Sequence, residues 1–400
     1  MIPTKIKTYR KRRTYCFILL LFLTIVPAMI FASISVSPTI FELQIPQGKS
    51  FTDAIRVVNM GKAEIVVKAY LSDFDFLDNG NIRFPDAGAG KYSLADYVRL
   101  NPTSLQLEPG EEKFVRFTIS IPENLTGEYQ GILFFQTMPK GIKSPAPGKQ
   151  VLVSTRIGAA IYAAVKPTVN KSSEISDIFF RQAQTQTPDN HSFHYALIYH
   201  NNGNIHLRPT GQLKILDAAG KEIASTPINE KNTSVLRDSC RIFEGDFKSK
   251  SEFRDGSYKI VAQIDYGKEI LEAEKPVFLL NTGGIETFTA KLTPSPSGKE
   301  STTTNATKIV FSAVTKGIEP AKEKEPRKKV FRIKSSSGEL KGEWLAVQTN
   351  ISSKTQPAEY MGEWIGQLKP GLYIAEFLVS PRENETLTSF CLIDNRAPGE

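Results

Sequence analysis

A regular alternation of side chains along residues 150–166 is the feature that most constrains the fold of this chain. The odd-numbered positions are nearly all apolar, whereas the even-numbered positions include Ser154, Arg156 and Lys166. A period of two over this length predicts a β-strand that buries one face. Residues 128–138 are predicted to form a second long strand, joined to the first by a loop that contains Pro, Gly and Lys. We therefore expect a β-sheet at the centre of the N-terminal part of the chain.

The predicted strand 150–166 is longer than the strand that precedes it, so part of its edge lacks a hairpin partner. The N–H and C=O groups of an unpaired edge are a template for a strand from another polypeptide. The sequence therefore predicts a partner-binding site along this strand, between Val151 and Ile157.

The first 32 residues combine a basic run with an apolar run. Six Lys and Arg residues lie between Lys5 and Arg13, and apolar residues then dominate as far as Ala32. This order is typical of a secretory signal peptide, with cleavage after Ala28 or Ala32. The alternative is an uncleaved N-terminal anchor, although the apolar run is shorter than the roughly 20 residues of a comfortable membrane span. Both interpretations predict an exported protein of the periplasm or cell envelope.

The charge and the cysteines also bear on the compartment and the partners. The formal net charge of +8 falls to about +2 when the six basic residues of the leader are set aside, which removes the support for a nucleic-acid partner. Beyond the leader the chain holds two cysteines, Cys240 and Cys391. They are interpreted either as one disulfide between domains or as two buried thiols.

Short strands separated by turn residues continue along the whole chain. Pro38 interrupts the first strand, which indicates a sheet edge or a switch between two sheets. About seven such strands up to Pro167 predict a β-sandwich over residues 33–167. The remaining length exceeds what one core can bury, so further domains are expected.

Two more domains are predicted on the same grounds. Residues 168–282 contain strands joined by Asn- and Gly-containing turns, and residues 283–400 begin with polar and charged linkers. Within the latter we predict a third, small β-sandwich with Trp344 and Trp364 as core or interface aromatics; the alternative is a spacer. The predicted fold class is thus all-β, with tandem β-sandwiches after residues 1–32.

The order of motifs in residues 33–167 resembles the N-terminal domain of PapD-like periplasmic pilus chaperones. The matching segments are ISVSPT in the first strand, a Leu-x-Leu-x-Pro-Gly turn followed by VRFTI, ILFFQTMP, and the alternating strand that ends in VKP. The resemblance implies an immunoglobulin-like sandwich whose last strand lends alternate apolar side chains to a subunit. The matching positions are Val151, Val153 and Thr155.

The family also holds a subunit's C-terminal carboxylate with two basic side chains, and here the pattern departs. No basic residue occurs between Ser33 and Gln47, so the first of the two is missing, while Arg156 lies near the second. We therefore predict these partner-binding residues: Val151, Val153, Thr155, Arg156 and Ile157. In the second domain, the Asn- and Gly-rich pattern from Asn201 to Gly211 is similar to immunoglobulin-like domains of WxL-associated surface proteins.

No catalytic motif is recognisable, so no enzyme activity, catalytic residue or cofactor is predicted. The four histidines between His191 and His206 suggest a metal site, but acidic or Cys ligands at a suitable spacing are lacking, which favours surface or turn histidines. Asp73, Asp75 and Asp78 are similarly interpreted as a solvated turn rather than a calcium loop. No metal site is predicted.

These observations lead to one functional hypothesis and one alternative. The first is an exported, non-enzymatic, pilus-chaperone-like assembly factor that binds partner subunits by β-strand addition. Its expected partners are protein subunits of a surface structure, with an outer-membrane assembly component as a further candidate. No nucleic acid is expected, and a membrane is contacted only through an uncleaved N-terminal segment. The alternative is a cell-surface or cell-wall binding multi-domain β-sandwich protein.

Overall fold

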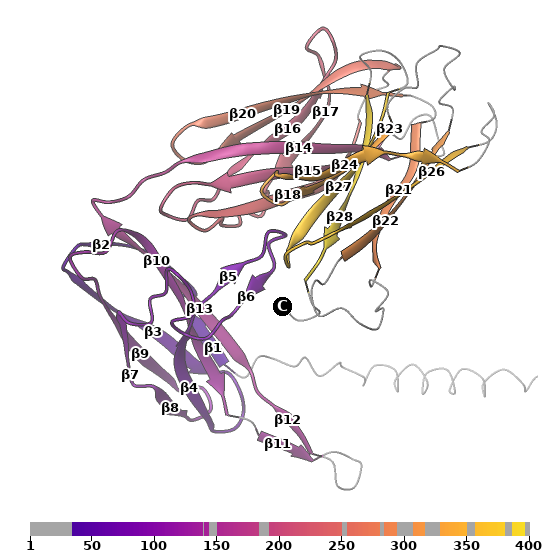
Figure 1. The fold of residues 1–400 in the computed structure, drawn as a ribbon. Coiled ribbons are helices and arrows are strands. Elements are labelled where there is room, and N and C mark those ends of the chain that lie inside the picture. Colours follow the sequence, from indigo (N-terminus) through magenta and orange to yellow (C-terminus); the bar gives the residue numbers. More distant parts are fainter. Residues whose placement is uncertain are drawn as a thin grey trace, which may run out of the picture.

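The computed structural model describes residues 34–138, 140–143, 150–183, 192–249, 254–280, 284–293, 307–316, 329–349, 357–380 and 386–396. These residues form strands β1 to β28 and no helix (Figure 1). The predicted all-β fold class, with tandem β-sandwiches, is therefore confirmed. In the described ranges there is no helix of the length and apolarity that crossing a membrane requires. The predicted leader at residues 1–32 lies outside the described residues.

The first sandwich consists of a four-stranded and a five-stranded sheet. The four-stranded sheet has the order β1 (Ile34–Ser37), β3 (Ser50–Asn59), β9 (Glu112–Ser120), β7 (Val98–Asn101). The five-stranded sheet has the order β2 (Ile40–Pro46), β13 (Arg156–Lys166), β10 (Gly127–Thr137), β4 (Ile65–Ser72), β8 (Ser104–Leu107). A short hairpin, β5 (Asp75–Phe76) and β6 (Ile82–Arg83), projects from this sandwich towards the other two (Figure 1).

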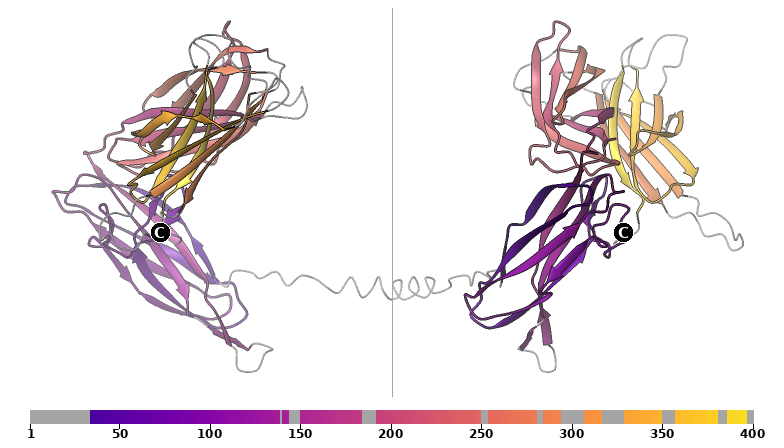
Figure 2. Two further views of the ribbon diagram at one scale, coloured as in Figure 1. Left: turned by 45° about the vertical axis from the view of Figure 1, so that its right-hand side comes forward. Right: turned by 90° about the vertical axis from the view of Figure 1, so that its left-hand side faces the viewer.

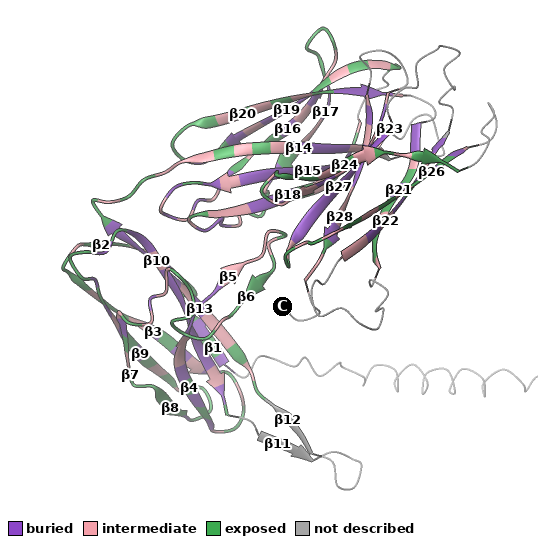
Figure 3. Ribbon diagram, in the orientation of Figure 1, coloured by how far each residue is buried: buried purple, intermediate pink, exposed green. Residues whose placement is uncertain are grey.

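Alternating side chains place the core of the first sandwich between its two sheets. In β9, Val115, Phe117 and Ile119 are fully buried, whereas the residues between them face outwards or are half-buried (Figure 3). Phe117 meets Phe41 of the facing sheet edge to face, with ring centres 5.0 Å apart. Each fully buried side chain of this size contributes about 1.5–3 kcal/mol through the hydrophobic effect, so the alternation in sequence is what holds the two layers together.

The N-terminal strand changes sheet at Pro38, as one of the two interpretations of this proline predicts. β1 pairs antiparallel with β3 in the four-stranded sheet, whereas β2 pairs parallel with β13 in the five-stranded sheet. Both strands lie at the edge of their sheet. The switch therefore determines how much of β13 is covered by β2.

The prediction of one continuous strand over residues 150–166 is wrong. Residues 150–153 form β12 (Gln150–Val153), which pairs with β11 (Lys140–Lys143) in the segment predicted as a loop, and β13 begins only at Arg156. Thr137 causes the break, because its N–H donates to Thr155 C=O (2.9 Å), while its Oγ1 accepts from Thr155 N–H (2.8 Å). The hydroxyl of Ser154 also donates to Thr137 C=O (2.6 Å).

The second and third sandwiches follow along the chain. The second pairs the sheet β14 (Ser173–Ala183), β15 (Ser192–Asn201), β18 (Ser239–Lys248) with the sheet β17 (Glu222–Ile228), β16 (Thr210–Leu216), β19 (Gly256–Asp265), β20 (Ile270–Leu279). The third pairs β21 (Gly284–Thr293), β22 (Thr307–Lys316), β26 (Ala358–Gly366), β25 (Val347–Gln348) with β24 (Leu340–Leu345), β23 (Lys329–Ser335), β27 (Leu372–Val379), β28 (Leu387–Asp394). Trp344 and Trp364 pack, partly buried, against the third core.

The two cysteines of the described residues are free thiols. Cys240 lies on β18 and Cys391 on β28, and no disulfide joins them. Burial raises the pKa of the Cys240 thiol to about 12 and that of Cys391 to about 11. Both are therefore protonated at neutral pH and unreactive as nucleophiles.

The second and third sandwiches lie side by side and share an apolar interface (Figure 2). The ring centres of Phe179 on β14 and Phe390 on β28 are 5.9 Å apart, and both side chains are buried. The rest of this cluster comes from both sandwiches: Ala196, Ile198, Ile242, Leu372 and Ile374. An interface of buried apolar side chains from two sheets resembles a domain core, so the two sandwiches are held in one orientation.

A group of charges stands beside this apolar interface. Asp177 of the second sandwich contacts Lys275 at 3.3 Å and Lys334 of the third sandwich at 2.5 Å. Glu376, almost fully buried, lies 3.6 Å from Lys334. Burial raises the pKa of the Asp177 carboxyl, but the two lysines outweigh it and hold this pKa below the ordinary value.

We predict that Asp177→Asn lowers the free energy of unfolding of the third sandwich by about 1–3 kcal/mol at pH 7, because two half-buried lysines lose the nearer of their two carboxylates and keep only Glu376. A carboxyl with a lowered pKa stabilises the fold above its unfolded pKa of about 4 and ceases to do so as pH falls. The difference between the variant and the wild type should therefore shrink below about pH 4. Both tryptophans lie in the third sandwich, so urea unfolding followed by tryptophan fluorescence measures it.

The matched control is Asp96→Asn, which removes an exposed carboxylate of the first sandwich. This variant should leave the unfolding curve of the third sandwich unchanged both at pH 7 and below about pH 4. An Asp177→Asn curve that coincides with wild type at pH 7 would contradict the assignment of this ion pair to the interface.

Candidate partner-binding site

One edge of β13 is only partly covered by a neighbouring strand. On one side β13 pairs with β10 along its length, from Arg156 opposite Gln136 to Val165 opposite Gly127. On the other side β2 pairs only from Ala160 onwards. In the part of the chain that the structure describes, residues 156–159 have no hydrogen-bonded strand on that second side. The open stretch is the beginning of β13, and it overlaps the predicted partner-binding site at Arg156 and Ile157.

The direction of the backbone groups shows which of them are open. The N–H of Ala160 donates to Thr39 C=O at the start of the β2 side (2.9 Å). Residues two apart along a strand direct their N–H and C=O groups to the same edge. Arg156 and Gly158 therefore turn their backbone groups towards the open side, whereas Ile157 and Ala159 turn theirs towards β10.

The side chains of this stretch divide between the two faces of the sheet. Ile157 is half-buried and packs against the first core, and Ala159 is fully buried there. Arg156 is exposed on the outer face, and Gly158 lies against Ile132 and Phe134 on the same face. Thr155 is half-buried, and its backbone is bonded to Thr137 rather than open. Of the predicted residues on β13 and just before it, only Arg156 therefore has both an exposed side chain and open backbone groups, whereas Ile157 packs against the core and Thr155 is bonded to Thr137.

The guanidinium group of Arg156 rests on two aromatic rings. Its central carbon lies 4.2 Å from the ring centre of Phe134 and 5.5 Å from that of Phe84. The two rings meet edge to face at 5.1 Å. Among the described residues Arg156 has no ion pair, and Phe84 is 38% exposed. An arginine held by cation–π contacts with its donors unpaired is well suited to bind an anion.

Val151 and Val153 lie on β12, in direct continuation of β13. The pairing of β12 within the described residues is with β11 only. The predicted residues therefore divide between β12, which holds Val151 and Val153, and the start of β13, which holds Arg156 and Ile157, with Thr155 in the break between the two strands. The side chains of Val151 and Val153 lie outside the described part of the structure.

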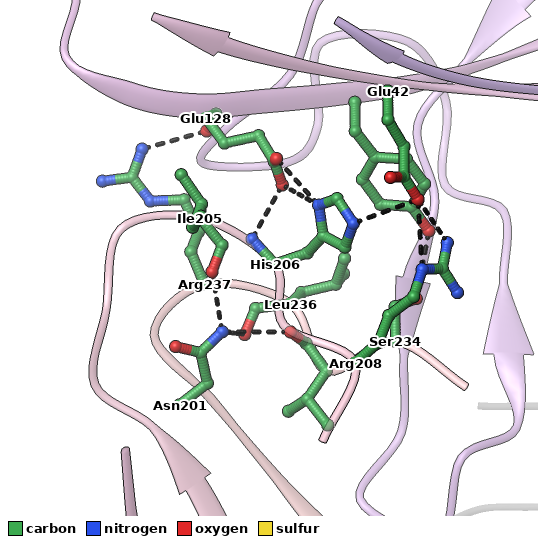
Figure 4. Close-up of polar contacts among 11 residues, drawn as sticks. Glu42, Glu128, Asn201, Ile205, His206, Arg208, Ser234, Leu236 and Arg237 are labelled. Carbon is green, nitrogen blue, oxygen red and sulfur yellow. Dashed lines mark hydrogen bonds and ion pairs between the residues drawn. The ribbon is translucent and has the colours of Figure 1, made fainter. Parts of the chain in front are cut away.

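A polar junction fixes the first sandwich against the second near the far end of β13, where Glu128 pairs with Ala164 (Figure 4). Glu128 on β10 is almost fully buried, and its carboxylate accepts from the backbone N–H of His206 (2.9 Å) and contacts the His206 ring at 2.8 Å. The Arg237 guanidinium donates to the backbone carbonyl of Glu128 (2.9 Å). Gly127 precedes Glu128 with φ +71°, and a Cβ there would lie 2.7 Å from Asn204 O, so the close approach requires glycine.

A second set of contacts extends the junction to β2 and β13. Arg208 donates to the Glu42 carboxylate at 2.9 Å, and Tyr162 bonds to Ser234 at 3.1 Å while its ring lies 4.1 Å from that of His206 (Figure 4). Partial burial raises the pKa of Glu42, but Arg208 and His206 outweigh it and keep this pKa below its usual value. The junction therefore contacts both strands that border the open edge.

His206 differs from the sequence-based interpretation of the histidines. It was predicted as a surface or turn histidine bonded to backbone carbonyls, and it instead contacts two carboxylates across a domain junction. Groups of His, Cys, Asp and Glu able to hold a metal ion are absent from the described residues. Nor do the three aspartates face solvent as one turn, because Asp73 is buried and accepts from Gly90 N–H and Ser93 Oγ.

Comparisons with known proteins were made by sequence and by structure. Neither a protein-family model nor a curated protein matches the sequence. Similar solved structures include the class 5 fimbriae chaperone CfaA, with 14% identity over 60% of this chain and 98% of that chain, at a TM-score of 0.35. About 60% of the chain is similar to PapD-like fimbrial chaperones. The likeness of the second domain to WxL-associated proteins stays a prediction.

Two further similar structures contain a chaperone with a subunit. One is the CsuC–CsuE chaperone–tip subunit pre-assembly complex of Acinetobacter baumannii, with 16% identity, 61% and 98% coverage and a TM-score of 0.32. The other is the Salmonella enterica SafA pilin in complex with the SafB chaperone, with 13% identity, 62% and 96% coverage and a TM-score of 0.30.

We predict that Glu128→Gln loosens the junction between the first two sandwiches. The substitution removes a buried carboxylate that has three contacts with His206, which should cost about 2–4 kcal/mol. The expected result is faster proteolytic cleavage in the linker around residues 167–172 and a broader distribution of interdomain distances between spin labels on the two sandwiches. The matched control is Glu112→Gln, which breaks the exposed pair with Arg56 and should cost at most about 1 kcal/mol. Identical cleavage rates for the two variants would contradict the prediction.

Proposed function

We propose that this protein is an exported, non-enzymatic assembly factor that captures a partner polypeptide by β-strand addition. The observation that carries the proposal is the open edge of residues 156–159, where one side of β13 has no hydrogen-bonded strand in the described part of the chain. A partner segment in extended conformation would satisfy the backbone groups of Arg156 and Gly158, and β12 would continue the same edge towards Val151 and Val153.

Side chains along the edge would add specificity to the backbone pairing. In strand addition, main-chain hydrogen bonds supply affinity and the pockets or charges beside alternate residues select the partner. Arg156, which rests on Phe134 and Phe84, would pair with a carboxylate of the partner. The two valines of β12 would contribute apolar side chains, as the resemblance to pilus chaperones implies.

The expected partners are subunits of a surface structure. The predicted secretory leader at residues 1–32 supports export to the periplasm or cell envelope, and the mature net charge of about +2 gives no support to a nucleic-acid partner. The sequence resemblance of residues 33–167 to pilus chaperones supports a role of this protein in the assembly of surface subunits.

A second candidate function is binding to the cell surface or cell wall. The third sandwich favours it, because it exposes large apolar side chains: Leu345 on the edge strand β24 and Ile365 on β26 are 67% and 65% exposed. Exposed apolar surface can mark an interaction site. Sedimentation of the purified protein with isolated cell wall, without a subunit partner, would favour this function over strand addition.

We predict that replacing both Val151 and Val153 with Asp abolishes partner capture. Two carboxylates on β12 would have to be desolvated beneath an added strand, which should reduce recovery of the partner at least about tenfold. The measurement is a cross-linked pull-down from an envelope fraction with mass spectrometry of the recovered proteins. Unchanged recovery would contradict strand addition at this edge.

We predict a smaller effect for Arg156→Ala, which removes the proposed carboxylate partner but leaves the edge intact. Partner affinity should fall about threefold, and the loss should be smaller at high salt because ion pairs at a partly exposed site are screened. Binding of the captured partner, once identified, is measured by calorimetry at low and high salt. The control is Arg116→Ala on β9, an exposed arginine of the opposite sheet, which should bind as wild type does.

A further inference from the structure

The outer face of the four-stranded sheet in the first sandwich carries a cluster of positive charge. Arg56 of β3, Arg99 of β7 and Arg116 of β9 are exposed there, because they alternate with residues turned to the core. Arg56 pairs with Phe114, two residues before Arg116, and Arg99 pairs with Thr118, two residues after it. The three arginines therefore form one diagonal row across three neighbouring strands.

Little acidic charge offsets these arginines. Of the described residues, only one acid, Glu112, is placed on this face by the strand register, and it pairs with Arg56 at 2.6 Å. Arg99 donates to two backbone carbonyls at 3.0 and 3.4 Å, and Arg116 takes part in no ion pair among the described residues. Three positive charges and one negative charge give the face a net charge of +2. The whole chain beyond the leader has a net charge of about +2 as well, so this face holds an excess that the remaining surface lacks.

Phe114 lies among these arginines with its ring in solvent. It is 55% exposed, whereas the next residue, Val115, is fully buried in the core. One exposed apolar residue is ordinary on a protein surface. An aromatic ring surrounded by cations, however, is typical of surfaces that lie on lipid headgroups, where the ring reaches the acyl chains and the cations contact phosphates.

Hydroxyl groups lie beside the arginines on the same face. The hydroxyls of Thr52 and Thr118 bond to each other at 2.9 Å, and Ser50 donates to Ser120 at 3.0 Å. Each pair uses one hydroxyl hydrogen, so one hydroxyl in each pair keeps a hydrogen that it can donate outwards. Guanidinium and hydroxyl groups are the donors that phosphate oxygens accept.

The chain before β1 favours a lipid surface over a dissolved polyanion. β1 is the edge strand of this same sheet, and its first residue, Ile34, comes two positions after Ala32, where the apolar run of the predicted leader ends. A leader of this kind brings the chain to a membrane. A dissolved phosphate polymer would pair with the arginines but would leave the Phe114 ring in water.

We propose that this face docks on an anionic lipid bilayer. Arg56, Arg99 and Arg116 would contact the lipid phosphates, and the ring of Phe114 would reach the boundary of the acyl chains. This contact adds to the one expected from an uncleaved leader. It also leaves the open edge of β13 free for a partner, because β13 belongs to the other sheet of the sandwich.

The test uses the mature protein expected from cleavage after Ala32, which keeps every described residue. Vesicles of phosphatidylcholine alone are compared with vesicles that also contain phosphatidylglycerol, and the bound protein is measured by flotation. The protein should float with the anionic vesicles, and added salt should lower the bound fraction because exposed charges are screened. Equal flotation with both kinds of vesicle, or none with the anionic ones, would overturn the proposal.

Two variants at exposed positions assign the binding to this face. Arg116→Gln should lower the partition coefficient for anionic vesicles about fivefold, the effect of one arginine near an anionic surface. Phe114→Ser should lower it by a similar factor and leave the salt dependence unchanged. The matched controls are Arg254→Gln and Ile270→Ser, at exposed positions of the second sandwich, and they should bind as wild type does. Wild-type partition of Arg116→Gln and Phe114→Ser would contradict the assignment.

A dissolved polyanion is the other occupant that the experiment distinguishes. Polyphosphate should bind more weakly than anionic vesicles at the same phosphate concentration, because it offers no apolar region to Phe114. Tighter binding of polyphosphate, unchanged in Phe114→Ser, would assign the face to a polyanion and overturn the docking on lipid.

Vesicle binding and partner capture can fail independently. The protein with both Val151 and Val153 replaced by Asp should bind anionic vesicles as wild type does, because β12 is not part of the four-stranded sheet. Arg116→Gln should in turn capture the partner as wild type does. Loss of vesicle binding in the variant with the two Asp residues would count against this face as the site of lipid contact.

Discussion

The late start of the pairing between β2 and β13 is the constraint on which the candidate site depends. The chain enters the five-stranded sheet only after Pro38, and its first paired position on β13 is Ala160. β13 itself begins four residues earlier, at Arg156. Backbone N–H and C=O groups nearly always have a hydrogen-bond partner in folded proteins. The groups of an edge left open in this way are therefore bonded to water or to another strand. Everything proposed for partner capture follows from that difference in length.

The two domain junctions use different physical means. Buried apolar side chains hold the third sandwich against the second, with Phe179 and Phe390 near the centre. The first and second sandwiches meet through a buried carboxylate, a histidine and two arginines. Buried polar groups of this kind define an orientation through hydrogen-bond geometry, and they cost free energy if one partner is lost. This polar junction lies at the end of β13 away from the open stretch, because Glu128 pairs with Ala164 whereas Phe134 pairs with Gly158.

The sequence predicts a good part of this fold, for identifiable reasons. Period-two alternation in residues 150–166 located the strand with the open edge, and Pro38 indicated the switch between sheets. The break at Ser154 and Thr155 could not be predicted, because it depends on Thr137, a residue of another strand. The sequence predicted Arg156 as a site residue. It did not predict the contact of Arg156 with the Phe84 ring, because Phe84 comes from a loop that is distant in the sequence. Glu128 and His206 are 78 residues apart, and no local pattern links them.

The apolar junction limits how the chain can be divided. Phe179, Ile198 and Ile242 belong to the second sandwich, yet they are buried because β27 and β28 of the third sandwich cover them. A shortened protein that ended near residue 280 would place these side chains in contact with water, as a single apolar patch on an otherwise complete sheet. Such a patch favours self-association, so the third sandwich acts as a permanent solubilising cover for the second.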